Sequence, residues 1–200
     1  MAIAATTERI GIFGGTFDPP HIAHLVMAEE VRDALGLARV LMGVAGAPWQ
    51  KVGEVDLSPA EDRLAMTEAA VRGIAGLEAC DLEVRRGGPS YMVDTLAELA
   101  ALHPGAELFL VLGADAAAGL DTWERAGELG DRATIVVVDR PGVVAPVPPG
   151  WDVRRVEAPR LDISSTDLRD RLARGRTVRL LVPDAVRAVI EARSLYSGGG

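Results

Sequence analysis

Two of the three histidines in this chain, His21 and His24, stand three residues apart directly after a glycine pair and a proline turn. If a helix starts here, both imidazoles lie on one face of its first turn. The first N–H groups of a helix have no partners within it, and its dipole is positive at that end. Gly14 and Gly15 follow the apolar residues 10–13, and a glycine lets the backbone approach a ligand closely. This pattern predicts a phosphate-binding site.

The residues between the glycines and the histidines end the predicted strand. They are Thr16, Phe17 and the turn 18–20, in which two prolines prevent further strand pairing. A metal site is the rival interpretation of the histidine pair. Neither histidine has a cysteine or an acidic residue at metal-ligand spacing, so we expect no protein-bound metal here.

A second phosphate-binding pattern lies near the end of the chain. Ser164 is placed to cap a helix, and Ser165 and Thr166 add hydroxyl groups to its first turn. Arg169 follows one turn later, where its guanidinium could join the helix N–H groups in binding a triphosphate. From the residues alone, an ordinary capped helix explains the segment equally well.

Trp123 and Asp115 follow the apolar run 107–112 and Gly113. A tryptophan in a region of short helices after a strand can form a wall on which a ring stacks, although an isolated tryptophan is more often part of the core. Loops 45–57 and 86–90 also follow predicted strands. The first of them is long enough to suggest a function.

The elements that must position these residues alternate between strand and helix. Apolar strands are predicted at 10–13, 40–44, 77–84, 107–112, 134–138 and 153–156. Helices are predicted between them, at 21–35, from Ser58 as N-cap to 72, from the loop at 86–90 to 102, in short pieces over 114–130, at 164–174 and at 183–193. This order predicts an α/β fold with a Rossmann-like, doubly wound parallel sheet. Ligands in such folds bind beyond the carboxyl ends of the strands.

Composition narrows the class of protein. A chain of 200 residues, 48% of them hydrophobic, suits one domain over 1–200, with disordered tails at 1–8 and 197–200. No apolar run reaches the roughly 18 residues of a membrane helix, and residues 1–8 do not resemble a signal peptide. The net charge of −8 argues against nucleic acid, and the single cysteine suggests the reducing cytoplasm. The oligomeric state stays open, and a homo-oligomer is compatible with the sequence.

The segment GGTFDPPHIAHL at 14–25 resembles the GGTFDPxHxGHL signature of the nucleotidyltransferase superfamily. Within it the chain resembles the bacterial nicotinate-mononucleotide adenylyltransferases. Supporting segments are GAPWQK at 46–51, GPSYMVDT at 88–95, GAD at 113–115 with the later tryptophan, and ISSTDLR at 163–169. Two residues depart from the family pattern: Ala23 replaces a glycine, and Met92 replaces a threonine.

The resemblance implies a reaction. AMP would pass from ATP to nicotinate mononucleotide, giving nicotinate adenine dinucleotide and pyrophosphate, with Mg²⁺ bound mainly through ATP and water. One rival is a relative with another acceptor, either phosphopantetheine or nicotinamide mononucleotide. The other rival is a non-catalytic module that senses nucleotides.

The resemblance also implies roles for individual residues. The catalytic residues would be His21, His24 and Arg169. ATP would be bound by Gly14, Gly15, Thr16, Phe17, His21, His24, Gly113, Asp115, Ile163, Ser165, Thr166 and Arg169. Nicotinate mononucleotide would be bound by Trp49, Lys51, Tyr91, Met92, Thr95, Asp115 and Trp123. Within this set, the backbone N–H groups of Tyr91 and Met92 would meet the nicotinate carboxylate, and Trp123 would stack on the ring.

Overall fold

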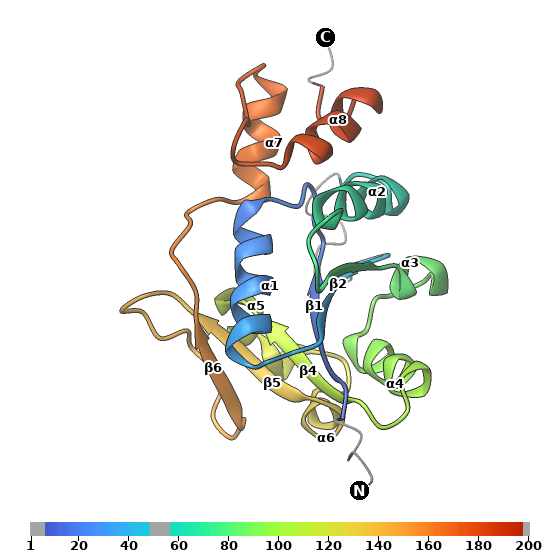
Figure 1. Cartoon of the computed structure of the whole chain (residues 1–200), viewed down its shortest axis with the longest axis vertical. Helices are drawn as coiled ribbons and strands as arrows, with labels where there is room; N and C mark the ends of the chain where they lie inside the picture. Colours follow the sequence, from blue (N-terminus) through green and yellow to red (C-terminus); the bar gives the residue numbers. More distant parts are fainter. Residues whose placement is uncertain (1–6, 49–56, 198–200) are drawn as a thin grey trace, which may run out of the picture.

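The computed structural model describes residues 7–48 and 57–197, and in this part of the chain six parallel strands form one sheet (Figure 1). The spatial order is β3-β2-β1-β4-β5-β6, which confirms the predicted Rossmann-like, doubly wound topology. The strands are β1 (Arg9–Gly15), β2 (Arg39–Val44), β3 (Leu77–Cys80), β4 (Glu107–Leu112), β5 (Thr134–Asp139) and β6 (Val153–Glu157). Because every neighbouring pair is parallel, all carboxyl ends meet at one edge. The order reverses between β1 and β4, where ligands bind in such sheets.

The helices are α1 (Ile22–Ala34), α2 (Ala60–Val71), α3 (Leu82–Arg86), α4 (Met92–Leu102), α5 (Ala114–Ala118), α6 (Leu129–Arg132), α7 (Ser165–Ala173) and α8 (Asp184–Ala192), with the 3₁₀ turns η2 (Leu120–Thr122) and η3 (Ala126–Glu128). Apart from α3, the helices lie close to the predicted positions, and α7 and α8 follow the last strand. Among the described residues, no helix combines the length and the apolar character needed to span a membrane.

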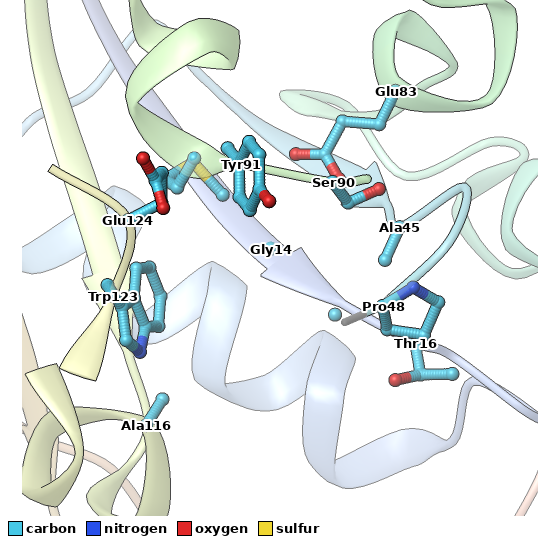
Figure 2. Close-up of a pocket in the computed structure, with 12 residues that line it drawn as sticks. Gly14, Thr16, Ala45, Pro48, Glu83, Ser90, Tyr91, Ala116, Trp123 and Glu124 are labelled. Atoms are coloured by element: carbon cyan, nitrogen blue, oxygen red, sulfur yellow. The ribbon is translucent and has the colours of Figure 1, made fainter. Parts of the chain in front are cut away.

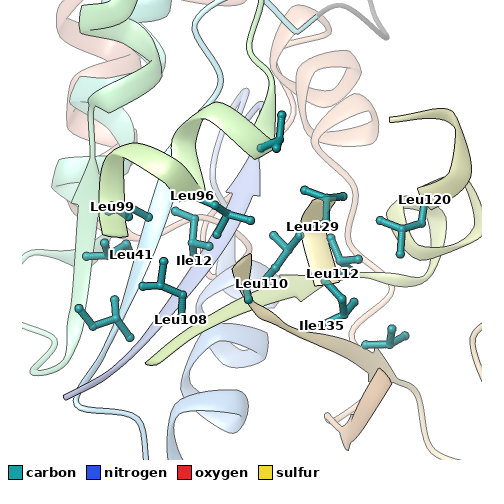
Figure 3. Packing of buried hydrophobic residues seen from close by; sticks show 14 of the residues in the cluster. Ile12, Leu41, Leu96, Leu99, Leu108, Leu110, Leu112, Leu120, Leu129 and Ile135 are labelled. Carbon is teal, nitrogen blue, oxygen red and sulfur yellow. The ribbon is translucent and has the colours of Figure 1, made fainter. Parts of the chain in front are cut away.

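Helices cover both faces of the sheet because successive strand side chains point to opposite sides. On one face, Ile12 and Leu110 pack in a cluster with Leu96 and Leu99 of α4 and with residues of α5 and α6 (Figure 3). On the other face, Val31 of α1 joins a cluster with side chains of β1, β2 and β4. The two clusters bury both faces of the sheet behind its carboxyl edge.

The last two helices pack on α2 rather than on the sheet. Leu168 of α7 and Ile190 of α8 are buried in one cluster with Met66 of α2. Figure 1 shows α7 and α8 beyond the carboxyl end of β1, next to the first turn of α1. The backbone N–H of Ile22 donates to the carbonyl of Leu181 at 3.1 Å, so the end of the chain meets the start of α1.

Two predicted elements are wrong in detail. The strand predicted at 77–84 ends at Cys80, the last residue that pairs with β2, and residues 82–86 turn into the short helix α3. The predicted Ser58 cap is also wrong. The helix begins at Ala60 after Pro59. The backbone of Ser58 instead bonds to the side chains of Asp18 and Arg63.

Candidate active site

A cavity of about 150 Å³ opens at the carboxyl edge of the sheet, beside β1. Figure 2 shows Trp123 and Glu124 on one side of it and Thr16 and Pro48 on the other. The lining comes from four segments: the end of β1, the loop after β2, the α3–α4 region and the segment after β4. Its residues are Gly14, Gly15, Thr16, Ala45, Pro48, Glu83, Ser90, Tyr91, Met92, Ala116, Trp123 and Glu124.

Gly14 and Gly15 line this cavity, and each also makes room for a neighbouring side chain. A Cβ on Gly14 would lie 2.6 Å from the terminal methyl of Met92. A Cβ on Gly15 would lie 2.7 Å from the ring of Phe17, which is buried and lies outside the cavity lining. Both distances are shorter than real Cβ contacts. A larger residue at Gly14 would displace the end of the Met92 side chain in the cavity wall, and one at Gly15 would push against the buried ring of Phe17.

The structure brings His21 and His24 together at the start of α1. Their rings stack with centroids 3.6 Å apart and planes inclined by 22°. The backbone N–H of His21 donates to Nδ1 of His24 at 3.2 Å. Because Nδ1 accepts this hydrogen bond, the neutral His24 ring carries its proton on Nε2. The ring of Phe17 contacts His24 edge-on, with centroids 5.1 Å apart, and helps to fix its orientation.

His21 is nearly inaccessible to solvent, at 4% exposure. Burial lowers the pKa of His21 to about 4, because removing the ring from water disfavours its charged form. Near neutral pH this ring is therefore uncharged and acts as a hydrogen-bonding group rather than a cation. Its buried Nδ1 has no hydrogen-bond partner among the described residues.

Helix α7 is fastened to the loop that carries the histidines. Ser164 caps α7 as predicted, since its Oγ accepts from the N–H of Asp167 at 3.1 Å. The hydroxyl of Ser165 donates to the carbonyl of Pro19 at 2.9 Å. Arg169 donates through Nη1 to the carbonyl of Asp18 at 2.8 Å and through Nη2 to Oγ1 of Thr166 at 3.3 Å. The guanidinium and the histidines are thus attached to one loop.

The far wall of the cavity combines a helix start with an indole. Tyr91 is the N-cap of α4 and has extended backbone angles. The first N–H groups of this helix therefore have no carbonyl acceptor within the helix. Trp123 and Met92 line the same cavity. The Nε1–H of Trp123 is buried and has no acceptor within the described part of the chain. This wall can accept an aromatic group that carries an anion.

Thr95 lies behind this wall and is not among the cavity-lining residues. It is fully buried, and its hydroxyl donates to Oε1 of Glu83 at 2.7 Å. Nη2 of Arg86 in turn donates to Oγ1 of Thr95 at 3.0 Å. The hydroxyl therefore supports Glu83, which does line the cavity.

The remaining predicted site residues are dispersed. Trp49 and Lys51 lie outside the described residues. Gly113 caps α5, and Asp115 is exposed in the first turn of that helix. Ile163 is half-buried and packs against the cluster formed by α2, α7 and α8. None of these three lines the cavity, although Gly113 follows β4 at the same sheet edge.

Two residues that sequence reasoning missed hold the loops together. Oγ of Ser90 accepts from the N–H groups of Gly46 at 2.9 Å and Ala47 at 3.3 Å, which joins the loop after β2 to the loop before α4. Arg63 of α2 is 2% exposed and donates only to carbonyl oxygens: those of Thr16, Ala45, Gly46 and Ser58. The sequence does indicate that Arg63 is buried, because it lies on the same helical face as the apolar Met66 and Ala70.

No group of three or more His, Cys, Asp or Glu side chains in the described part of the chain is arranged to hold a metal ion. The geometry offers instead hydrogen-bond donors, two helix starts and Arg169. Such groups bind phosphates and stabilise charge that develops on them.

Comparisons with known proteins agree with this chemistry. The model of a family described as cytidylyltransferase-like matches residues 12–171. A probable nicotinate-nucleotide adenylyltransferase of Roseiflexus sp. is 48% identical over 201 residues, covering 96% of this chain and 99% of the relative. A protein of the same description from Geobacillus thermodenitrificans is 44% identical over 188 residues, covering 94% and 86%. The fold is shared with Plasmodium falciparum nicotinic acid mononucleotide adenylyltransferase complexed with NaAD, at a TM-score of 0.75 and 18% identity, covering 94% of this chain and 97% of that one.

Proposed function

This chain belongs to the nicotinate-nucleotide adenylyltransferases, and we propose that the cavity beside β1 and the adjoining loop 16–21 hold its two nucleotide substrates. The enzyme transfers AMP from ATP to nicotinate mononucleotide, forming nicotinate adenine dinucleotide and pyrophosphate. One observation supports the proposed placement above the others. Arg169 and His24 are both bonded to loop 16–21, which carries His21. Thr16 of the same loop lines the cavity whose other side bears Trp123, whereas Arg169, His21 and His24 themselves are not among the lining residues.

The reaction requires little covalent chemistry from the protein. A phosphate oxygen of nicotinate mononucleotide attacks the α-phosphorus of ATP, and the bond from this phosphorus to the β-phosphate oxygen breaks as pyrophosphate leaves. A phosphate monoester has a second pKa of about 6, so the nucleophile is already an anion near neutral pH. The protein has to align the two nucleotides and stabilise the developing charge.

The ATP phosphates lie, in this proposal, between α1 and α7. His24 donates from Nε2, since its Nδ1 is occupied by the backbone of His21. The neutral His21 contributes hydrogen bonding, and Arg169 supplies the positive charge. The hydroxyl of Thr166 and the first N–H groups of α7 add further donors, while Ser165, whose hydroxyl donates to the carbonyl of Pro19, contributes through its backbone N–H. Gly14, Gly15, Thr16, Phe17, Gly113, Asp115 and Ile163 complete the proposed ATP site.

Nicotinate mononucleotide occupies the cavity. The nicotinate carboxylate faces the N–H groups at the start of α4, at Tyr91 and Met92, and the ring stacks on Trp123. Asp115 takes a ribose hydroxyl. Thr95 supports the pocket through Glu83 rather than by direct contact. On the basis of sequence alone, Lys51 remains a proposed phosphate ligand and Trp49 a proposed contact of nicotinate mononucleotide.

Mg²⁺ enters with ATP in this proposal. The ion is held by phosphate oxygens and water, which is its usual mode of binding to nucleotides. The described residues offer no cluster of three acidic or imidazole side chains for direct ligation. The lone Cys80, a buried free thiol, suits the reducing cytoplasm where we place the reaction.

A pyrophosphate-release assay tests the acceptor. The purified chain is incubated with MgATP and with nicotinate mononucleotide, nicotinamide mononucleotide or phosphopantetheine in turn. We expect the highest kcat/KM with nicotinate mononucleotide. Release only with phosphopantetheine would point to the first rival. Nucleotide binding without release with any acceptor would point to the sensing module.

A further inference from the structure

The end of the chain folds back under the loop that carries the histidines. After α8, Ser194 and Tyr196 both adopt positive φ, at 52° and 60°, and the Tyr196 side chain packs against the cluster formed by α2, α7 and α8. Its hydroxyl donates to Oδ1 of Asp18, 178 residues earlier in the sequence, and contacts Sδ of Met66 at 3.6 Å. Burial, followed by the hydrogen bond to Asp18, raises the pKa of Tyr196 above its ordinary value, so the phenol remains a donor.

Asp18 connects this tyrosine to Arg169. The carboxylate is 1% exposed, and its second oxygen, Oδ2, accepts from the N–H of Ser58 at 3.1 Å. The backbone carbonyl of the same residue accepts from Nη1 of Arg169 at 2.8 Å. The side chain of Asp18 is therefore held from two directions while its carbonyl holds the guanidinium.

We infer that Tyr196 is a positioning residue for the transfer reaction, which holds Asp18 so that its carbonyl orients Arg169 toward the ATP phosphates. This inference rests on the proposed role of Arg169. Without the phenolic hydroxyl, a buried carboxylate oxygen loses its donor, and such an oxygen must find another partner or move. Movement of Asp18 shifts the carbonyl that fixes Arg169. A small displacement of a group that binds the reacting phosphates costs much of the rate.

A purely structural role makes a different prediction. Leu195 and Tyr196 both pack against the α2–α7–α8 cluster, so either side chain could simply anchor the end of the chain. Tyr196→Phe removes one hydroxyl and keeps the ring. Leu195→Ala removes packing from the same segment and leaves the hydroxyl in place, which makes it the matched control.

The test measures initial rates with ATP as the varied substrate at saturating nicotinate mononucleotide, and then with the roles exchanged. Tyr196→Phe should lower kcat/KM for ATP by about ten- to a hundredfold, the range expected for losing a hydrogen bond to a charged group. KM for nicotinate mononucleotide should stay within about twofold of wild type. Leu195→Ala should lower the urea midpoint and change kcat/KM for ATP by less than about twofold, as a substitution that affects packing alone would do.

A double variant tests the route through Arg169. In an Arg169→Ala background, Tyr196→Phe should have almost no further effect on kcat/KM for ATP, because the group that it positions is gone. Wild-type kinetics in Tyr196→Phe would overturn the inference. An effect that persists in full without Arg169, or that Leu195→Ala reproduces, would overturn it as well.

A wrong proposed function would give a different result from a wrong role for Tyr196. In that case wild type itself releases no pyrophosphate with nicotinate mononucleotide. ATP affinity measured by calorimetry still decides the inference, since Tyr196→Phe should weaken ATP binding by about tenfold or more and Leu195→Ala should not. Equal ATP affinity of wild type and Tyr196→Phe would overturn it.

Discussion

The backbone N–H of His21 donates to Nδ1 of His24 at 3.2 Å, and the two rings stack with centroids 3.6 Å apart. This relationship gives the two histidines different properties. His24 is fixed as the tautomer with a proton on Nε2. His21 is buried beneath it and stays neutral near pH 7. Two residues of the same type can therefore make different contributions at one phosphate site.

His24→Ala should lower kcat by about 10²- to 10³-fold, the usual range for one preorganised donor. His24→Asn is the informative companion, because its amide oxygen can replace Nδ1 as acceptor for the His21 N–H while the Nε2 donor is lost. We expect Asn to recover stability in urea denaturation but not kcat. Retention of more than about half of the wild-type kcat by either variant would contradict the placement of His24 at the reacting phosphates.

Stability should fall on acidification because of His21. Its pKa is 6.5 in an unfolded chain and about 4 in the folded protein, so the unfolded state binds the proton first. The stability that depends on neutral His21 is complete above about pH 6.5 and lost as pH falls toward 4. Its full size is about 3 kcal/mol. Urea denaturation at several pH values should show a shallower dependence for His21→Gln than for wild type. Parallel curves for the two proteins would contradict the low pKa.

Arg63→Lys should destabilise the fold although it conserves charge. Four carbonyl oxygens accept from the buried guanidinium, and an ammonium has only three donors on a less suitable geometry. We expect a loss of at least about 2 kcal/mol in the free energy of unfolding. Arg72→Lys, at the exposed end of the same helix, is the control and should stay within about 0.5 kcal/mol of wild type. Similar urea midpoints for both variants would show that the Arg63 hydrogen bonds contribute little.

The acid mononucleotide should be preferred over the amide by at least about tenfold in kcat/KM. Backbone N–H groups at the start of α4 suit a carboxylate, whereas an amide leaves one donor unpaired at a cost of about 1–3 kcal/mol. Trp123→Ala should weaken both acceptors together, since stacking depends on the ring and not on its substituent. Assays of both mononucleotides with both proteins check this. Equal wild-type efficiencies would exclude the carboxylate pocket, and a lost preference in the variant would assign specificity to Trp123.

Local features of the sequence were sufficient for the sheet and for part of the site. Apolar runs such as Glu107–Leu112 specify buried parallel strands, and parallel strands necessarily bring their carboxyl ends to one edge. The Ser164 cap and the spacing of His21 and His24 depend on neighbours within a single turn. These interactions are short-range, so residue type and spacing predict them.

Tertiary structure decided the features that depend on partners distant in sequence. The strand predicted at 77–84 stops at Cys80, where its pairing with β2 ends and α3 follows, and Ser58 bonds to Asp18 and Arg63 instead of capping its helix. The network that joins Tyr196 to Arg169 through Asp18 spans almost the whole chain. No local pattern encodes such contacts. A buried polar group takes whichever partner the packing of distant elements brings within reach, because leaving it unpaired costs more than the hydrogen bond itself contributes.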